Sequence, residues 1–313
     1  PEELVRDADI AMYRAKAAGK ARYAVFDRSL HAEVSNRLRL EADLRHAIAQ
    51  GQLAVVYQPL VELEGNRLVG FEALARWNHP EQGPIGPDVF IPVAEESGLI
   101  VGLTDLVLKR ACDQLRQWQL IDESFADLRI QVNLSGRDVA QAGLTGRISQ
   151  ALLGAGLQAQ HLTLELTENI LMERLETALP MLEELRGLGV RLSVDDFGTG
   201  YSSLAHLSTL PIDSLKVDRS FVRNLSAGSK EAMVVRGIVQ LGQSLGKDVV
   251  AEGIETASQF DQLRGMGCRL GQGFLMARPM SAERITALLV GQQPWTGGVA
   301  LPVALNPLAT QLH

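Results

Sequence analysis

Two strand-like segments joined by only three residues constrain the fold of this chain most. Residues 53–63 and 67–77 are both rich in apolar side chains, and Glu64, Gly65 and Asn66 alone separate them. So short a connection forces the two strands to pair as an antiparallel hairpin. Any fold proposed for this chain must therefore contain one strand that runs against its neighbour.

Strands and helices alternate after this hairpin. The sequence predicts six further strands, at residues 128–135, 162–168, 191–197, 214–218, 248–254 and 268–275. Amphipathic segments predict helices at 102–119, 137–153, 170–188, 229–246, 256–266 and 281–291. Such alternation implies parallel strands joined by right-handed crossovers. With the hairpin, the sequence predicts an α/β fold, a TIM-like (β/α)₈ barrel whose first strand is antiparallel.

An open, doubly wound sheet is the competing fold. It would normally carry a GxGxxG turn after an early strand, and the chain has none. Outside the alternating region, residues 1–27 predict a helix that stops at Gly19 and a short strand, and residues 36–50 predict another helix. The last residues, 294–313, are rich in Pro and Gly and predict an extended or loosely docked tail. The start at Pro1, in the middle of a helical pattern, suggests a fragment of a longer protein. Whether sensory or membrane segments precede it there is an open question.

Composition narrows the classes of function. The 313 residues carry a net charge of −7, which argues against direct binding to the phosphates of a nucleic acid polymer. No apolar run approaches the roughly 18 residues of a membrane helix, and no signal peptide is visible, so we expect no membrane contact from this stretch. Cys112 and Cys268 stand alone, without a CxxC motif. They predict buried thiols in a reducing cytoplasm rather than a zinc site.

Polar side chains stand at or near the ends of nearly all the predicted strands. Because the carboxyl ends of parallel barrel strands meet at one mouth, these side chains are expected to converge there. They are Glu72, Asn133, Glu165, Glu168, Asp195, Asp196, Lys216, Glu252, Glu255 and Gln272. Carboxylate and amide oxygens suit Mg²⁺ or Mn²⁺, and this set is larger than one ion needs. Enzymes that hydrolyse phosphodiesters often use a pair of such metal ions, so the set indicates a metal-dependent enzyme.

Each member of this set has a plainer interpretation when taken alone. A single glutamate at a strand end is more often solvated or ion-paired, and Lys216 alone would more often form a salt bridge. Asn133 and the residues after it could form a turn or a helix cap. The indication of a metal site comes from the coincidence of these residues across several strands.

The adjacent carboxylates of Asp195 and Asp196 need a special backbone. Neighbouring residues of a strand face opposite sides, so both can reach the mouth only if the strand ends there. Gly198 and Gly200 would allow such a break. One aspartate could then bridge two cations, which would remove the repulsion between the two carboxylates.

An ordered set of segments over residues 36–291 resembles the EAL family of cyclic di-GMP phosphodiesterases. The triplet that names the family is Glu72-Ala73-Leu74, within FEALARW. The other matching segments are YQP (57–59), FIPVAEESGLI (90–100), VNLS (132–135), ELTE (165–168), DDFGTGYSSL (195–204), LKVD (215–218), AEGIE (251–255) and QGFLMARP (272–279). The triplet alone would carry no weight, whereas the ordered set is highly specific.

The resemblance implies a role for each matching residue. The implied ligands of a first metal are Glu72, Asn133, Glu165 and Asp195, and those of a second are Asp195, Asp196 and Glu252. The implied substrate contacts are Gln58, Arg76 and Gln272. Glu168 is expected to anchor the loop after the fifth strand, and Glu255 to lie behind the ligands.

The resemblance also implies a reaction and its partners. Two Mg²⁺ or Mn²⁺ ions would activate a water for in-line attack that opens cyclic di-GMP to linear pGpG. Lys216 would orient this water or accept its proton, and among cations its pKa should be lowered. Together with Glu72 and Glu252 it forms the predicted catalytic set. We also expect a homodimer that uses residues 201–210.

Two other classes of function stay open. The first is a receptor that binds cyclic di-GMP without hydrolysing it, and the second is an unrelated barrel enzyme that uses a metal enolate. No ligand implied by the resemblance is missing, which favours catalysis.

The segment before the barrel carries a second resemblance. Residues 8–27 are similar to the end of a GGDEF diguanylate cyclase domain, whose name-giving motif is absent from this chain. We therefore expect a GGDEF remnant or linker over residues 1–30, a phosphodiesterase barrel over 31–293 and a tail over 294–313.

Overall fold

The computed structural model describes Met12 and residues 28–200 and 204–291. The helix and strand expected within residues 1–27 and the tail at 294–313 lie outside this part of the chain. The chain divides into two compact units, one of residues 1–53 and 77–100, the other of residues 54–76 and 101–313.

The smaller unit contains two helices and a short β-ladder. Its helices are α2 (Arg28–Ala49) and α3 (Pro87–Ser97), which pack together. Strand β3 (Gly83–Ile85) pairs with the segment from Trp77 to His79. The sequence did not predict β3 or α3. Strand β3 has only three residues, and Pro92 stands inside α3, where proline normally argues against a helix.

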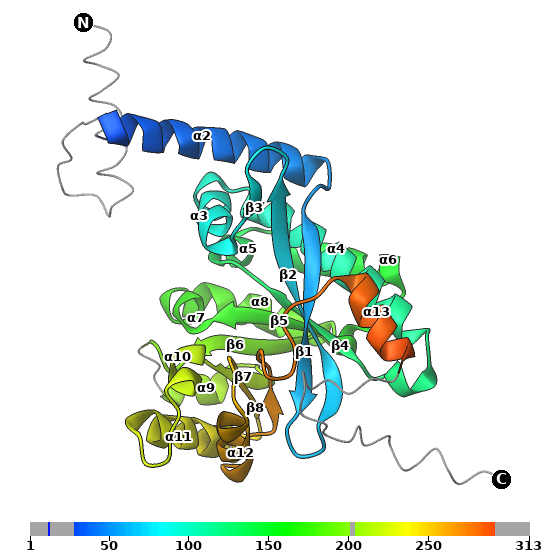
Figure 1. The fold of residues 1–313 in the computed structure, drawn as a ribbon, viewed down its shortest axis with the longest axis vertical. Coiled ribbons are helices and arrows are strands. Elements are labelled where there is room, and N and C mark those ends of the chain that lie inside the picture. The colour runs from blue at the N-terminus through cyan, green and yellow to red at the C-terminus, as the bar shows by residue number, and fades with distance from the viewer. Residues whose placement is uncertain (1–11, 13–27, 201–203, 292–313) are drawn as a thin grey trace, which may run out of the picture. The chain divides into compact units, whose positions relative to one another are not determined.

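The larger unit is a closed barrel, which confirms the predicted fold (Figure 1). Its strands are β1 (Ala54–Glu62), β2 (Arg67–His79), β4 (Arg129–Asn133), β5 (Leu162–Thr167), β6 (Arg191–Phe197), β7 (Ser214–Val217), β8 (Asp248–Ala251) and β9 (Leu270–Gly271). They follow the order β1-β9-β8-β7-β6-β5-β4-β2, and pairing between β1 and β2 closes the circle. Strand β1 is antiparallel to both of its neighbours, and the other barrel pairings are parallel.

Helices connect the parallel strands of the barrel, and a last helix, α13, follows the final strand. They are α4 (Ile100–Gln119), α5 (Gly136–Ala140), α6 (Leu144–Ala155), α7 (Glu168–Glu173), α8 (Leu175–Gly187), α9 (Leu204–Thr209), α10 (Arg219–Arg223), α11 (Lys230–Ser244), α12 (Ala257–Gly265) and α13 (Ala282–Val290). Two single-turn 3₁₀ helices add Glu123–Phe125 and Ala159–His161. None of the described helices combines the length and the apolar character that a bilayer crossing requires.

Two of the predicted helices are each divided in two. Between α5 and α6 the backbone of Gly143 has φ +89°, a left-handed conformation that interrupts helical hydrogen bonding. Between α7 and α8 the interruption falls at Arg174, whose φ is −129°. The apolar periodicity continues across both breaks, so it did not reveal them.

An aromatic cluster joins the hairpin to α4 within the larger unit. The ring of Trp118 lies 4.6 Å from that of Phe71 and 4.9 Å from that of Tyr57, measured between centroids. Phe71 and Trp118 are fully buried. Since residue 71 faces this cluster, alternation directs its neighbour at position 72 to the other side of the sheet, toward the barrel axis.

Candidate functional site

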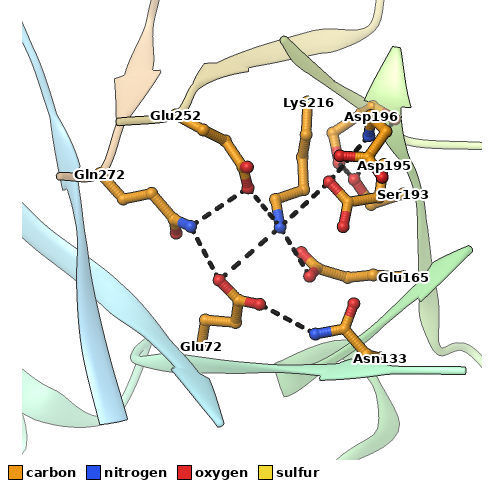
Figure 2. A network of polar contacts seen from close by, with 10 residues as sticks. Glu72, Asn133, Glu165, Ser193, Asp195, Asp196, Lys216, Glu252 and Gln272 are labelled. Carbon is orange, nitrogen blue, oxygen red and sulfur yellow. Dashed lines mark hydrogen bonds and ion pairs between the residues drawn. The ribbon is translucent and has the colours of Figure 1, made fainter. Parts of the chain in front are cut away.

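The side chain of Lys216 forms the centre of the candidate site. Its ammonium nitrogen lies 2.6 Å from Glu252 Oε1, 2.7 Å from Glu165 Oε2, 3.4 Å from Asp195 Oδ1 and 3.7 Å from Glu72 Oε2. Figure 2 shows these four carboxylates pointing toward the lysine, three from separate strands and Glu252 from the residue after β8. The expected convergence of strand-end side chains is therefore present in the structure.

Two amides extend this cluster on its Glu72 side. Asn133 Nδ2 donates to Glu72 Oε1 at 2.8 Å, and Gln272 Nε2 donates to Glu72 Oε2 at 2.7 Å. Gln272 Nε2 also lies 3.1 Å from Glu252 Oε1. Both oxygens of Glu72 are thus held by neutral donors, which fixes the orientation of the carboxylate (Figure 2).

Two buried carboxylates of the cluster, Glu72 and Glu165, respond to this environment in opposite ways. Burial would raise the pKa of Glu72, but the charge of Lys216 and the hydrogen bonds from Gln272 and Asn133 together hold it below its ordinary value. Burial also raises the pKa of Glu165. The neighbouring charges of Glu72 and Asp195 raise it further, and it lies well above its ordinary value. Glu165 therefore retains a proton more readily than Glu72 does.

Glu252 and Lys216 form the closest ion pair of the cluster. Burial raises the pKa of Glu252 to about 8, with Lys216 opposing the shift and Asp195 adding to it. Burial would lower the pKa of Lys216, yet the surrounding carboxylates raise it well above the ordinary value. The sequence expectation was a lowered pKa for a lysine beside two cations. In the structure the surrounding carboxylates raise the pKa of Lys216 instead, so its side chain stays a protonated ammonium group.

The break that brings two adjacent aspartates to the mouth lies at Asp196 itself. Its φ is +54°, and the pairing of β6 with β7 shifts register between Val194 and Phe197. This bulge reverses the alternation before the strand ends, so Asp195 and Asp196 both lie near Lys216 (Figure 2). The sequence located the need for a break but assigned it to Gly198 and Gly200.

Glu168 contacts the loop that follows β6. Its Oε2 accepts hydrogen bonds from the backbone N–H of Gly198 at 2.8 Å and of Gly200 at 3.4 Å. The carboxyl group is almost completely buried at the start of α7. A Cβ on residue 200 would stand 2.8 Å from Glu168 Oε1, so a side chain there would disturb this contact.

The other predicted residues lie around the cluster or apart from it. Gln58 is buried on β1 opposite Glu72, and Arg76 is half-buried further along β2. Burial lowers the pKa of Arg76, and the charge of Glu72 opposes that shift. Glu255 is exposed, and no hydrogen bond or ion pair joins its side chain to the described residues of the cluster.

Asp218 is a member of the site that sequence reasoning missed. Its carboxyl shares a hydrogen bond with Asp196, and burial together with the charges of Asp195 and Asp218 raises the pKa of Asp196 to about 6. Asp218 also caps α10, where its Oδ1 accepts from the backbone N–H of Ser220 at 3.0 Å. Capping is a sufficient reason for an aspartate at this position, so no separate signal in the sequence marks Asp218 as part of the site.

The donor set fits a hard divalent cation in chemistry, although its present arrangement is centred on the lysine. Within residues 28–200 and 204–291, no three His, Cys, Asp or Glu side chains are positioned to hold one metal ion between them. The reason is that Lys216 Nζ lies where the carboxylates converge. Two acceptors, Glu165 Oε1 and Gln272 Oε1, are buried without a hydrogen-bond partner, and an oxygen-seeking ion would satisfy such groups.

Among known protein families, the EAL domain matches residues 41–279 of this chain. In Pseudomonas aeruginosa, the bifunctional diguanylate cyclase/cyclic di-GMP phosphodiesterase MucR is 45% identical over 285 residues, and the cyclic di-GMP phosphodiesterase NbdA is 44% identical over 288 residues. These matches cover 91% and 92% of this chain but only 41% and 36% of the relatives' own lengths. The chain thus spans well under half of either relative.

Solved structures give the same family. The PaMucR phosphodiesterase in complex with c-di-GMP superposes with a TM-score of 0.75 at 46% identity, over 79% of this chain and 99% of that one. The cAMP-bound EAL enzyme Bd1971 gives a TM-score of 0.77 at 32% identity, over 82% of this chain and 71% of that one. From the family match, the two relatives and these structures together, this chain belongs to the EAL domain family.

Proposed function

We propose that this chain hydrolyses cyclic di-GMP to linear pGpG with the help of two Mg²⁺ or Mn²⁺ ions. The observation that carries the proposal is the gathering of four carboxylates and two amides around Lys216 at one mouth of the barrel. The named activities of MucR and NbdA support the same substrate.

The proposed ion ligands divide into two groups that share one aspartate. We assign Glu72, Asn133, Glu165 and Asp195 to one ion, and Asp195, Asp196 and Glu252 to the other. When bound, the cations supply Lewis-acid activation of the scissile phosphate and of the attacking water. The carboxylates must turn part of their oxygens away from Lys216 Nζ to receive them, and the unpartnered Oε1 of Glu165 is already free to do so.

Lys216 is proposed to act as a hydrogen-bond donor that orients the attacking water. The sequence left open whether it orients the water or accepts its proton. The carboxylates around it raise its pKa, which supports the donor role. Its side chain is fully buried, so its position relative to the cluster is well defined by packing.

Arg76 and Gln58 are proposed to bind the dinucleotide. Arg76 is half-buried, and its Nη1 donates to the backbone oxygen of Ala75 at 2.8 Å, which leaves further N–H groups for a phosphate. Gln58 lies beside Glu72 across the β1–β2 ladder. Gln272 would contact the substrate while it holds Glu72 in place.

One assay tests the proposed reaction directly. The purified chain is incubated with cyclic di-GMP and Mg²⁺ or Mn²⁺, and the products are separated by chromatography. We expect pGpG from the wild type, loss of product in Glu72→Ala, and wild-type rates in Glu64→Ala, a control at the exposed tip of the hairpin. Binding of cyclic di-GMP without pGpG under either metal would contradict catalysis and identify a receptor instead.

The homodimer expected from the family resemblance remains a prediction. Residues 201–203 of the expected contact segment lie outside the described residues, and α9 contributes the part that follows. Sedimentation of the purified chain with and without Mg²⁺ and cyclic di-GMP would test it, and a single monomeric species under all conditions would refute it.

A further inference from the structure

A cavity of about 410 Å³ lies at the opposite end of the barrel from the carboxylate cluster. Its walls come from the amino ends of several strands, including Arg67 of β2, Arg129 of β4, Arg191 of β6 and Asp248 of β8. Arg269, next to β9, and His161, next to β5, also line it. We call this space the amino-end cavity. None of the catalytic or binding roles proposed above uses it.

Positive charge exceeds negative charge around the amino-end cavity. Asp248 is shared by two guanidinium groups, at 2.7 Å from Arg269 and at 3.5 Å from Arg191. Glu62, just outside the cavity, is likewise shared by Arg67 and Arg269, at 3.3 Å and 3.5 Å. Even when the exposed Asp127 at the rim is counted, four arginines face three carboxylates.

Arg129 is the guanidinium that lacks a partner. Among the described residues it forms no hydrogen bond or ion pair, although it is only partly accessible. Burial lowers the pKa of Arg129 and the charge of the neighbouring Arg191 acts in the same direction, while the charges of Asp248 and Asp127 oppose the shift without a direct contact. A second group is unsatisfied as well. His161 is 8% exposed, and its buried Nδ1 has no hydrogen-bond partner.

We propose that the amino-end cavity is a binding site for a phosphate-bearing anion, with Arg129 as its principal ligand. A planar guanidinium matches two phosphate oxygens with parallel hydrogen bonds, and a half-buried setting strengthens such contacts. The surplus positive charge would neutralise the phosphate, and the unsatisfied Nδ1 of His161 could form a hydrogen bond with it. The volume exceeds that of free phosphate, so the terminal phosphate of a small organic molecule also fits.

The test measures anion binding in the absence of divalent cations, so it is independent of phosphodiesterase activity. The purified chain, in EDTA and a low-salt buffer without phosphate or sulfate, is titrated calorimetrically with inorganic phosphate and, separately, with 5′-GMP. We expect saturable binding that Arg129→Gln weakens by at least about tenfold, as the loss of a charge-assisted contact implies. Arg236→Gln, an exposed arginine on α11 outside the cavity, should bind like the wild type.

Asp127→Asn provides a variant with the opposite expected effect. Removing this carboxylate from the rim should tighten phosphate binding, and this prediction holds even if Arg129→Gln fails to fold. The ring resonances of His161 should shift on titration. Equal affinity for both ligands would indicate that phosphate alone is recognised, and tighter binding of 5′-GMP that the cavity also contacts its organic part. Absence of saturable binding, or equal binding by the wild type and Arg129→Gln, would overturn the proposal.

Discussion

Lys216 Nζ lies 2.7 Å from Glu165 Oε2, and both side chains are fully buried. A charged pair in this setting owes its stability to the match between the two charges, because each alone would suffer the cost of burial. Three further carboxylates approach the same nitrogen. The lysine is therefore the counter-ion that holds the site together, and its charge links the stability of the barrel to the chemistry at its mouth.

Lys216→Met should destabilise the folded chain in EDTA. The substitution removes the positive charge among four carboxylates, and breaking such a buried pair costs about 3–5 kcal/mol. Urea unfolding at pH 8 measures the loss. At pH 5 the loss should be smaller, because the raised pKa values of Glu165 and Glu252 let those carboxyls become neutral instead. The same loss at both values of pH would contradict this account.

Without divalent cations, the stability of the folded chain should fall as pH rises from about 4.5 to about 8. The pKa of Glu252 is raised from 4.5 to about 8, so over this range the folded state binds more protons than the unfolded state. The contribution is on the order of 5 kcal/mol for a pKa that rises from 4.5 to about 8. Thermal unfolding in EDTA across this range measures it.

Two comparisons separate this effect from other titrations. Glu252→Gln should reduce the dependence on pH, since the amide does not titrate, and the part that stays belongs to Glu165 and Asp196, whose pKa values are also raised. Adding Mg²⁺ should also reduce it, because cations favour the ionised carboxylates. Glu72, whose pKa is lowered, acts in the other direction, but it loses its contribution only as pH falls below about 4.5. A stability that rises steadily between pH 5 and pH 8 in EDTA would refute the prediction.

The barrel and most members of its polar cluster could be predicted because both follow from topology. A three-residue link fixed the antiparallel first strand, and strand–helix alternation directed the polar strand ends to one mouth. Such conclusions need only the order and length of the elements. They do not need the rotamer of any side chain.

The details that the sequence did not reveal depend on single torsions and on charge balance in three dimensions. The left-handed backbone of Asp196 is uncommon for a residue other than glycine, and the neighbouring glycines offered an easier explanation. The central position of Lys216 follows from distances to four strands. The unpaired state of Arg129 became visible only when the partners of the surrounding arginines were known.

Asp196→Asn and Asp196→Val should separate the charge at this position from its backbone strain. Asparagine adopts the left-handed region more readily than most residues, so Asp196→Asn should fold normally and lose phosphodiesterase activity. Valine is β-branched and resists φ near +54°, so Asp196→Val should also lose about 1–3 kcal/mol of stability. Urea unfolding of both variants beside turnover provides the comparison. Equal stability of the two variants would show that the bulge is not strained.

Gly200→Ala should impair activity through the loop that Glu168 holds. An added Cβ would stand 2.8 Å from Glu168 Oε1 and 2.9 Å from Asn169 Oδ1, closer than side chains normally approach. The carboxylate must then move, and with it the acceptor of the hydrogen bonds from Gly198 and Gly200.

The matched control is Gly146→Ala in α6, where no atom lies within 4 Å of the new Cβ and alanine favours the helix. We expect at least about a tenfold loss of turnover in Gly200→Ala, since a displacement of about 1 Å near a reacting centre costs that much or more. Gly146→Ala should retain full turnover with equal or higher thermal stability. If both variants turned over substrate equally well, the contact between Glu168 and the loop would have no part in positioning Asp195 and Asp196.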